Sequence, residues 1–199
     1  MANVKITELV SGSALTGTEL FESVQTASSV KLTATQVKDF VLDLGYGSFY
    51  DTTDQSATAS TATPIKYGTV DLSRGITVAN DGSGNKTFII FATSGVYNVS
   101  TSLQFANADS SNHAVKVWLK KNGADIANSA STFKVPKLAD GGVVVFEINL
   151  VLSLSAGDII QYVWATPNTA VTLDYTAPTV SPYVSPAVPS AIFVATQLK

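Results

Sequence analysis

Residues 96–105, with the sequence Val-Tyr-Asn-Val-Ser-Thr-Ser-Leu-Gln-Phe, decide the fold class of this chain. Large side chains recur here at alternate positions, and those on one face are Tyr97, Val99, Leu103 and Phe105. The side chains on the other face are polar, namely Asn98, Ser100, Ser102 and Gln104. Because successive side chains of a strand point to opposite faces, this pattern predicts a strand with one face in a core.

The same period of two recurs on both sides of this stretch, from residue 67 onward. The segment 115–120 alternates in the same way and is followed by Asn122-Gly123, which predicts a hairpin because both positions tolerate positive φ. Further strands are predicted over residues 87–91, 146–154, 159–164 and 191–198. Short strands separated by turn signals predict a β-sandwich over 67–199. Most of the seven prolines lie between 167 and 189, where they predict an irregular loop without helix.

The first 45 residues predict a small α+β module. Segments 19–25 and 29–32 are candidate short strands. Thr33 and Gln36 then have the spacing of a capping box, which begins a helix. The helix is expected to carry an apolar stripe and to end at Gly45, a residue suited to the C′ position. The stripe consists of Val37, Phe40, Val41 and Leu44. The stripe of so small a module is expected to need a partner, either the rest of the chain, a sister subunit or a larger assembly. The alternative, which carries equal weight, is that the helix packs on the module's own strands.

Residues 46–66 are predicted to form a Ser/Thr/Ala-rich linker or arm. The segment from Asp51 to Pro64 contains no large apolar side chain, so it offers little to a hydrophobic core. Such a segment is expected to be extended or to lie along a neighbour. The predicted domain organisation is therefore a module over 1–45, a linker over 46–66 and the β-domain over 67–199.

The composition excludes several classes of function. A formal net charge of −3 leaves no basic excess to neutralise phosphates, so we expect no nucleic-acid binding. The absence of cysteine removes disulfides and thiolate metal sites. No apolar run approaches the length of a membrane span, so we expect no membrane insertion. The N-terminus lacks the apolar region of a signal peptide, so synthesis without export is expected.

Residues able to support catalysis are scarce, so we expect no enzyme, no cofactor and no metal. His113 is the single histidine and lies in a polar segment, where a solvated imidazole is expected. Asp81, Asp109 and Asp158 lie in predicted turns, where a calcium site stays open although no EF-hand spacing supports one. Glu147 is either a solvated residue of its strand or, less in keeping with the pattern, a buried and perturbed acid.

Trp118 is the candidate residue for recognition of a partner or receptor. By alternation it shares a face with Lys116 and Lys120, and an aromatic side chain with basic neighbours suits a glycan or a protein. His113 is included as a neighbouring candidate contact. An alternative is that Trp118 is covered, either by an interface or by a loop such as the proline-rich segment 178–189, and this alternative is favoured.

Three stretches of the β-domain resemble the C1q/TNF-like jelly roll. They are Gly95-Val96-Tyr97, the segment from Val117 to Gly123, and the segment from Leu154 to Ile160. The closing segment from Val188 to Phe193 resembles versions of this domain in bacteriophage proteins. The resemblance covers about residues 67–199 and implies a homotrimer. In such a trimer, the face that carries Glu147 and Asn149 points toward neighbouring subunits, so these two residues are candidate interface contacts.

The N-terminal segment is similar to a module that opens many phage tail-fibre and other virion proteins. The similar stretches are 6–9, 14–25 and 31–37. This resemblance implies an attachment function for the module. It makes residues 1–64 the expected contact with other virion proteins, with the predicted helix as the docking element.

Together the two resemblances imply a bacteriophage structural protein located in the virion. A tail fibre or receptor-binding subunit, displaying a trimeric jelly roll for host attachment through surface glycan or protein, is slightly favoured. The alternative is a capsid decoration or cement protein that bridges head subunits with its 1–64 arm. A free glycan-binding module and a glycan-degrading enzyme are the less favoured readings, since the latter needs two carboxylates in one cleft.

Overall fold

The computed structural model describes residues 20–25, 28–37 and 44–199 of the chain. The chain divides into two compact units, residues 1–43 and residues 44–199. No helix among the described residues has both the length and the apolar composition needed to cross a membrane.

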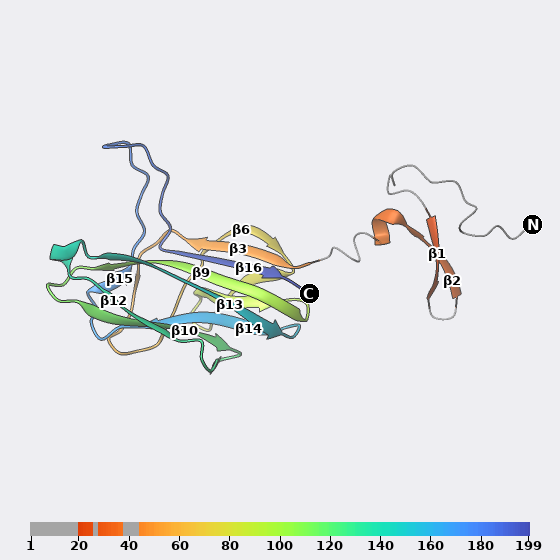
Figure 1. The fold of residues 1–199 in the computed structure, drawn as a ribbon, viewed down its shortest axis with the longest axis horizontal. Coiled ribbons are helices and arrows are strands. Elements are labelled where there is room, and N and C mark those ends of the chain that lie inside the picture. Colours follow the sequence, from red (N-terminus) through yellow and green to blue (C-terminus); the bar gives the residue numbers. More distant parts are fainter. Residues whose placement is uncertain (1–19, 26–27, 38–43) are drawn as a thin grey trace, which may run out of the picture. The chain divides into compact units, whose positions relative to one another are not determined.

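The first unit contains a β-hairpin followed by the start of a helix (Figure 1). Strand β1 (Leu20–Gln25) pairs antiparallel with β2 (Ser28–Thr33), and residues 34–37 are helical. The helix begins with the predicted capping box. The Gln36 backbone N–H donates to Thr33 Oγ1 at 3.1 Å, and the Thr33 backbone N–H donates to Gln36 Oε1 at 2.8 Å. The two predicted strands and the beginning of the helix are thus confirmed.

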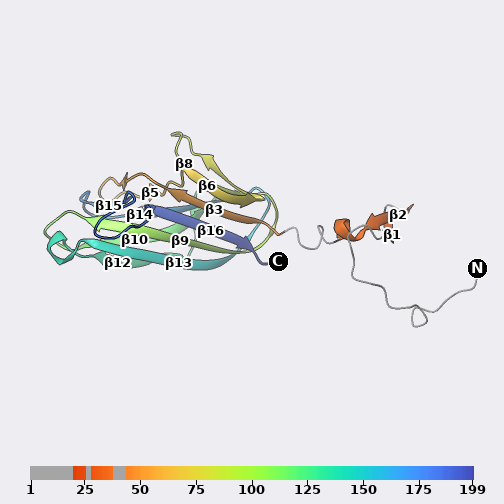
Figure 2. The ribbon, with the colours of Figure 1, turned by 90° about the horizontal axis from the view of Figure 1, so that it is seen from above.

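The second unit is mainly β and contains two antiparallel sheets, the arrangement of a β-sandwich (Figures 1 and 2). The first sheet consists of β4 (Gln55–Ser56), β15 (Val171–Leu173), β9 (Gly95–Asn107), β16 (Ala191–Gln197), β3 (Tyr46–Asp51) and β6 (Thr69–Arg74), with β13 (Val143–Leu154) paired to β9. The second sheet consists of β11 (Ala124–Asp125), β10 (His113–Lys121), β14 (Ile159–Ala165), β8 (Lys86–Phe91) and β7 (Ile76–Asn80), with β12 (Ser131–Val135) paired to β10 and β5 (Thr63–Pro64) to β14. A short 3₁₀ helix, η2 (Leu138–Asp140), precedes β13.

The hydrophobic core lies between the two sheets and is built from the alternating faces that the sequence predicts. In β9 the four predicted inward residues, Tyr97, Val99, Leu103 and Phe105, are all fully buried. Opposite them, β10 contributes Val115, Val117 and Leu119, which are fully buried as well. The alternate residues of β13 pack against the same core. The predicted strands and their inward faces are therefore confirmed, as is the β-sandwich.

The predicted hairpin turn at Asn122-Gly123 is also present. Both residues have positive φ, 51° and 84°, and they join β10 to β11 through the pairing of Lys121 with Ala124. Asparagine and glycine populate this backbone region at low energy, which is why the dipeptide predicts the turn. The proline-rich segment 175–190 forms no helix, again as predicted.

The predicted linker over 46–66 is wrong. These residues contribute β3, β4 and β5, and both Phe49 and Ile65 are fully buried in the core. Strand β3 pairs with β16 across its whole length, from Tyr46↔Thr196 to Asp51↔Ala191. The sandwich therefore begins at about residue 44 rather than at 67. The small polar residues of segment 51–64 join the sheets through backbone hydrogen bonds, which need no large apolar side chain.

Candidate functional site

His113 is not a solvated loop residue, contrary to the sequence-based expectation. It is the first residue of β10, and its side chain is only 14% exposed. Its Nε2 lies 2.6 Å from Asp109 Oδ2, and Asn168 Nδ2 donates to the same carboxylate oxygen at 2.9 Å. The hydrogen bond from His113, followed by that from the Ser110 backbone, lowers the pKa of Asp109. The loop between β9 and β10 is thereby tied to the segment after β14.

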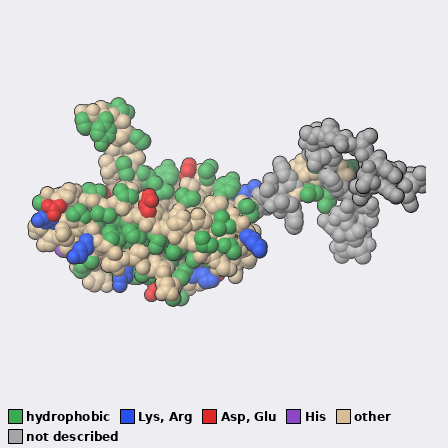
Figure 3. All heavy atoms as spheres, viewed as in Figure 1, with side chains coloured by type: hydrophobic (Ala, Val, Ile, Leu, Met, Phe, Trp, Pro, Cys, Tyr) green, Lys and Arg blue, Asp and Glu red, His purple; other side chains and the backbone are tan. Residues whose placement is uncertain are grey.

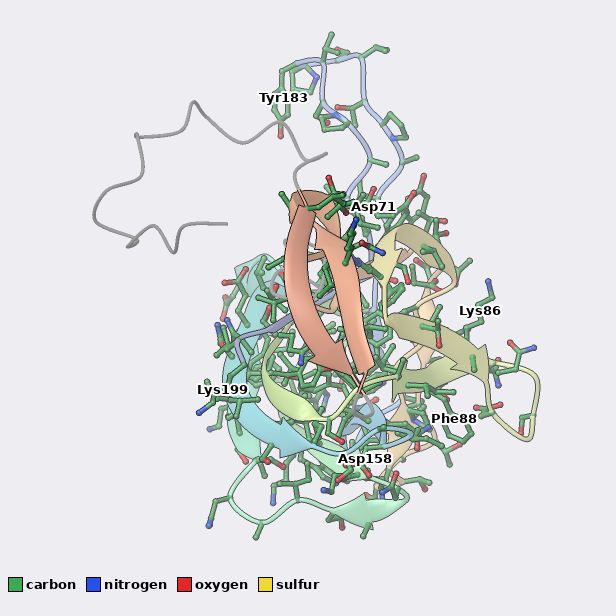
Figure 4. All side chains as sticks on the ribbon, turned by 90° about the vertical axis from the view of Figure 1, so that its right-hand side faces the viewer. Asp71, Lys86, Phe88, Asp158, Tyr183 and Lys199 are labelled. Atoms are coloured by element: carbon green, nitrogen blue, oxygen red, sulfur yellow. The ribbon has the colours of Figure 1, made fainter. Side chains whose placement is uncertain are left out.

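Asp158 joins the two turns that carry the strongest sequence signals. Its Oδ1 accepts from Asn122 Nδ2 at 2.7 Å, and its Oδ2 accepts from the Ser155 backbone N–H at 2.9 Å and lies 3.2 Å from Lys121 Nζ. The Ser155 hydrogen bond, then the Asn122 hydrogen bond, lower the pKa of Asp158. Figure 4 shows Asp158 in the turn before β14. The Asp158 carboxylate thus helps to hold the β10–β11 hairpin against this turn, together with two hydrogen bonds between Asn122 and the Ile159 backbone, both at 2.8 Å.

We expect Asp158→Ala to lower the free energy of unfolding at neutral pH by about 1.5–3 kcal/mol, because charged hydrogen bonds are lost from a nearly buried group. The depressed pKa means that this contribution is present above the unfolded carboxyl pKa of about 3.9. It disappears as the pH falls through the lower folded pKa. Urea unfolding at pH 7 and below pH 4 measures the difference.

Asp140→Ala is the matched control for this variant. Asp140 is an exposed carboxylate 3.8 Å from Lys137 Nζ, so its removal is expected to change stability by less than about 0.5 kcal/mol. A destabilisation by Asp158→Ala that persisted undiminished in acid would contradict the role of the ionised carboxylate.

The turn carboxylates do not assemble into a metal site within the described residues. No three His, Asp or Glu side chains gather there. Asp81 accepts from the backbone N–H groups of Ser83 and Asn85, so it shapes the β7–β8 turn. Asp109 and Asp158 are engaged as described above. Asp81 thus acts within its own turn, whereas Asp109 and Asp158 each join two separate segments.

Trp118 lies on the outer face of β10 with its indole ring held in place. Its Nε1 donates to Asp125 Oδ1 at 2.7 Å, and Lys120 Nζ lies 3.0 Å from the same oxygen. The indole hydrogen bond, followed by the Lys120 contact, lowers the pKa of Asp125. Lys116 and the adjacent Lys134 of β12 pair with no carboxylate in the described part of the chain. The surface around Trp118 is therefore basic, with Asp125 already engaged.

An open groove of about 430 Å³ runs beside Trp118. Its walls include Lys116, Trp118, Thr132, Pro167 and Ser60. No residue of the proline-rich segment 175–190 lines it. Figure 1 shows this loop projecting on the side of β3, β6 and β16, away from β10. The expectation that segment 178–189 covers Trp118 is therefore wrong, since the loop leaves the sandwich on the other side.

Glu147 and Asn149 lie exposed on the outer face of the first sheet, on the solvent side of β13. The strand register places Glu147 beside Ser102, Ser102 beside Ile192, and Ile192 beside Tyr50. The next row is formed by Asn149, Ser100, Val194 and Ser48. Figure 2 shows the four strands β13, β9, β16 and β3 side by side. A shallow hollow of about 430 Å³ lies over both rows.

This outer face is mostly uncharged and partly apolar. Its exposed apolar side chains include Val143, Val145, Val151 and Val194. Glu147 is the one charged residue that the outward positions of these four strands carry, and it forms no ion pair with any described residue. The neighbouring strand β6 adds two charged residues, Asp71, whose Oδ2 accepts from Ser48 Oγ at 3.2 Å, and the exposed Arg74, which pairs with Tyr46. A large exposed sheet face of this kind is typical of an interaction surface.

The predicted docking helix is described only at its beginning. Val37 is exposed, whereas Phe40 and Val41 lie outside the described residues. Leu44 is not helical and falls in the sandwich unit, so its inclusion in the helical stripe is wrong. Gly45 is not a left-handed C′ residue. Instead its backbone N–H donates to Gln197 Oε1 at 2.9 Å, and the chain continues directly into β3.

The sequence reasoning missed the valines around Glu147. Val143, Val145 and Val151 share the parity of Glu147 in β13, so the alternation that located Glu147 also identifies them as outward-facing. The alternation in β16 identifies Val194 as outward-facing in the same way. No comparable signal marks them as parts of one surface, because β16 joins β9 only through tertiary pairing.

No known protein-family model matches this chain, and no curated protein is significantly similar to it in sequence.

Proposed function

We propose that this chain is a non-enzymatic structural protein of a bacteriophage virion surface, associated with the tail as a fibre or receptor-binding subunit. The sandwich is a C1q/TNF-like jelly roll that assembles as a homotrimer. The N-terminal unit docks on other virion proteins. Residues 46–64 belong to the sandwich, so the docking segment that we propose is residues 1–43 and not the expected 1–64.

The strand order supports the jelly roll. Numbering the eight main strands β3, β8, β9, β10, β12, β13, β14 and β16 from one to eight gives the sheets 1-8-3-6 and 2-7-4-5. This order arises when a ribbon of antiparallel strands folds over itself, as in a jelly roll with two Greek keys. The strands β4, β5, β6, β7, β11 and β15 extend these two sheets.

The observation that carries the proposal is the outer face of β13, β9, β16 and β3. It exposes several valines and one charge, so covering it with a second copy removes apolar surface from water and desolvates few ionised groups. The opposite sheet differs, since its outer face is basic around the Trp118 groove. The number of subunits, three, follows from the family resemblance.

The tail role is supported by this difference between the two outer faces. Assembly through the uncharged face leaves Trp118, Lys116 and Lys120 available to a host-surface glycan or protein. Trp118 is held in position by Asp125, so its ring is ordered before a ligand arrives. A capsid decoration protein needs the same self-assembly but does not need this groove.

Two measurements together test the proposal: native mass of the full chain and labelling of intact particles with antibody against residues 44–199. We expect three times the 20.8 kDa chain mass and label at the tail. Label scattered over the head would instead support the decoration protein. A single-chain mass without label would contradict both readings, and turnover of host polysaccharide by the purified protein would contradict the non-enzymatic one.

A further inference from the structure

The loop between β15 and β16 is an ordered arm. Its two sides are joined by backbone hydrogen bonds between Thr176 and Val188, at 3.0 and 2.8 Å, and between Thr179 and Ser185, at 3.1 and 3.0 Å. Thr179 Oγ1 also donates to the Tyr183 carbonyl at 3.0 Å. Figure 1 shows the arm projecting from the sandwich on the side of β3, β6 and β16. Backbone pairing of this kind holds the end of the arm away from the domain.

The end of the arm is apolar and is not covered by the rest of residues 44–199. Val180, Tyr183 and Val184 are 86%, 70% and 82% exposed. Figure 3 shows hydrophobic side chains gathered at this end, and Figure 4 shows Tyr183 there, beyond the two sheets of the sandwich. Three large apolar side chains on a projecting support do not contribute to the core of their own domain. Their exposure instead suits contact with another molecule.

The charge of the arm restricts its partner. No charged residue occurs from Tyr175 to Leu198, so the arm offers no cation for phosphate or for an acidic partner. A matching surface must itself be largely uncharged. The outer face of β13, β9, β16 and β3 has that character, and the arm projects on the side of the sandwich to which this sheet belongs. We therefore expect a second copy packed on that face to lie on the side toward which the arm projects.

We propose that residues 175–190 form an inter-subunit clasp, in which Val180, Tyr183 and Val184 pack on a neighbouring copy of this chain. This proposal rests on the self-assembly included in the proposed function. The sheet face supplies the main contact between copies, and the clasp adds a second contact at its margin. In a closed ring, the arm of each subunit then packs on one neighbour, and the arm of the other neighbour packs on that subunit.

The test uses crosslinking at position 183 in the full chain. A photoreactive benzoylphenylalanine replaces Tyr183 in isotopically light protein, which is mixed and reassembled with heavy wild-type protein. We expect crosslinked peptides that combine light and heavy chains. The same group placed at Thr132, on the outer face of the other sheet, is the control and is expected to yield none. Crosslinks confined to one chain, or none between copies in an assembled sample, would overturn the clasp.

A second variant measures what the arm contributes. Replacing Val180, Tyr183 and Val184 together by serine changes only exposed side chains, so the monomer fold is expected to be unaffected. The dissociation constant of the assembly is expected to rise at least about tenfold. An unchanged constant in an assembled protein would reject the clasp and leave the proposed self-assembly intact. A monomeric wild-type protein would reject both, so the two failures are distinguishable.

Discussion

Phe193→Ala is expected to lower the free energy of unfolding by about 3–5 kcal/mol, the largest stability effect that we expect for this chain. Phe193 is fully buried in β16, and its ring centroid lies 5.6 Å from that of Tyr67 and 6.1 Å from those of Phe49 and Tyr162. These neighbours come from both sheets and from the segment before β6. Removing the ring therefore leaves a cavity where several segments meet, and the surrounding aromatic rings cannot close it fully.

Urea unfolding followed by circular dichroism, at one protein concentration, measures this loss. A domain of this size has a total stability of about 5–15 kcal/mol, so the variant is expected to be marginally folded. Lys134→Ala is the control, because Lys134 is an exposed strand residue and its change is expected to stay within about 0.5 kcal/mol. A loss of unfolding free energy below about 1 kcal/mol for Phe193→Ala would contradict the burial of this ring at the centre of the hydrophobic core.

Val194→Glu is expected to raise the dissociation constant of the assembly by at least about a hundredfold while leaving the monomer folded. Val194 is the residue next to Phe193 but points outward, into the hollow that Glu147 also lines. A new carboxylate there has no cation among the outward residues of the four strands and lies near an existing negative charge. Burying it between copies leaves an unpaired charge with a like-charged neighbour, which costs several kcal/mol.

Native mass across a dilution series, with circular dichroism of the same samples, measures assembly and folding separately. Thr132→Glu adds the same charge to an exposed position on the other sheet, near Lys116 and Lys134, and is expected to leave the assembly unchanged. Assembly of Val194→Glu with wild-type affinity would remove the outer face of β13, β9, β16 and β3 from the interface. Loss of the fold in Val194→Glu would contradict the outward orientation of residue 194.

The opposite roles of Phe193 and Val194 show why the strands were predictable from sequence. Alternation is a local property, because each residue's direction in a strand follows from that of its neighbour. The inward residues of β9, β10 and β13 could therefore be named in advance. Turn chemistry is similarly local, which is why Asn122-Gly123 and the Thr33–Gln36 capping box were both predictable. The candidate interface residues Glu147 and Asn149 were placed on an outward face by the same reasoning.

Pairing between distant segments is not a local property. The segment 51–64 lacks large apolar residues, yet Gln55 pairs with Leu173 and Thr63 with Trp164. Its backbone groups form sheet hydrogen bonds with residues more than a hundred positions away in the sequence. The alternation of apolar and polar residues does not predict such partners. His113 is a related case, since Asn168, which binds the same carboxylate as the imidazole, comes from a loop 55 residues further along the chain.

The sequence alone thus determined the β-class of the larger unit, the inward face of each long strand and the turn at residues 122–123. These follow from side-chain direction and from backbone preferences over a few residues. Only the tertiary structure decided that the sandwich begins near residue 44, that β16 lies between β9 and β3, and that the arm over 175–190 projects beside that sheet. Those features depend on which strands share backbone hydrogen bonds. The backbone groups of a strand can form equally good hydrogen bonds with many other segments. The packing of the whole core therefore decides which segments pair.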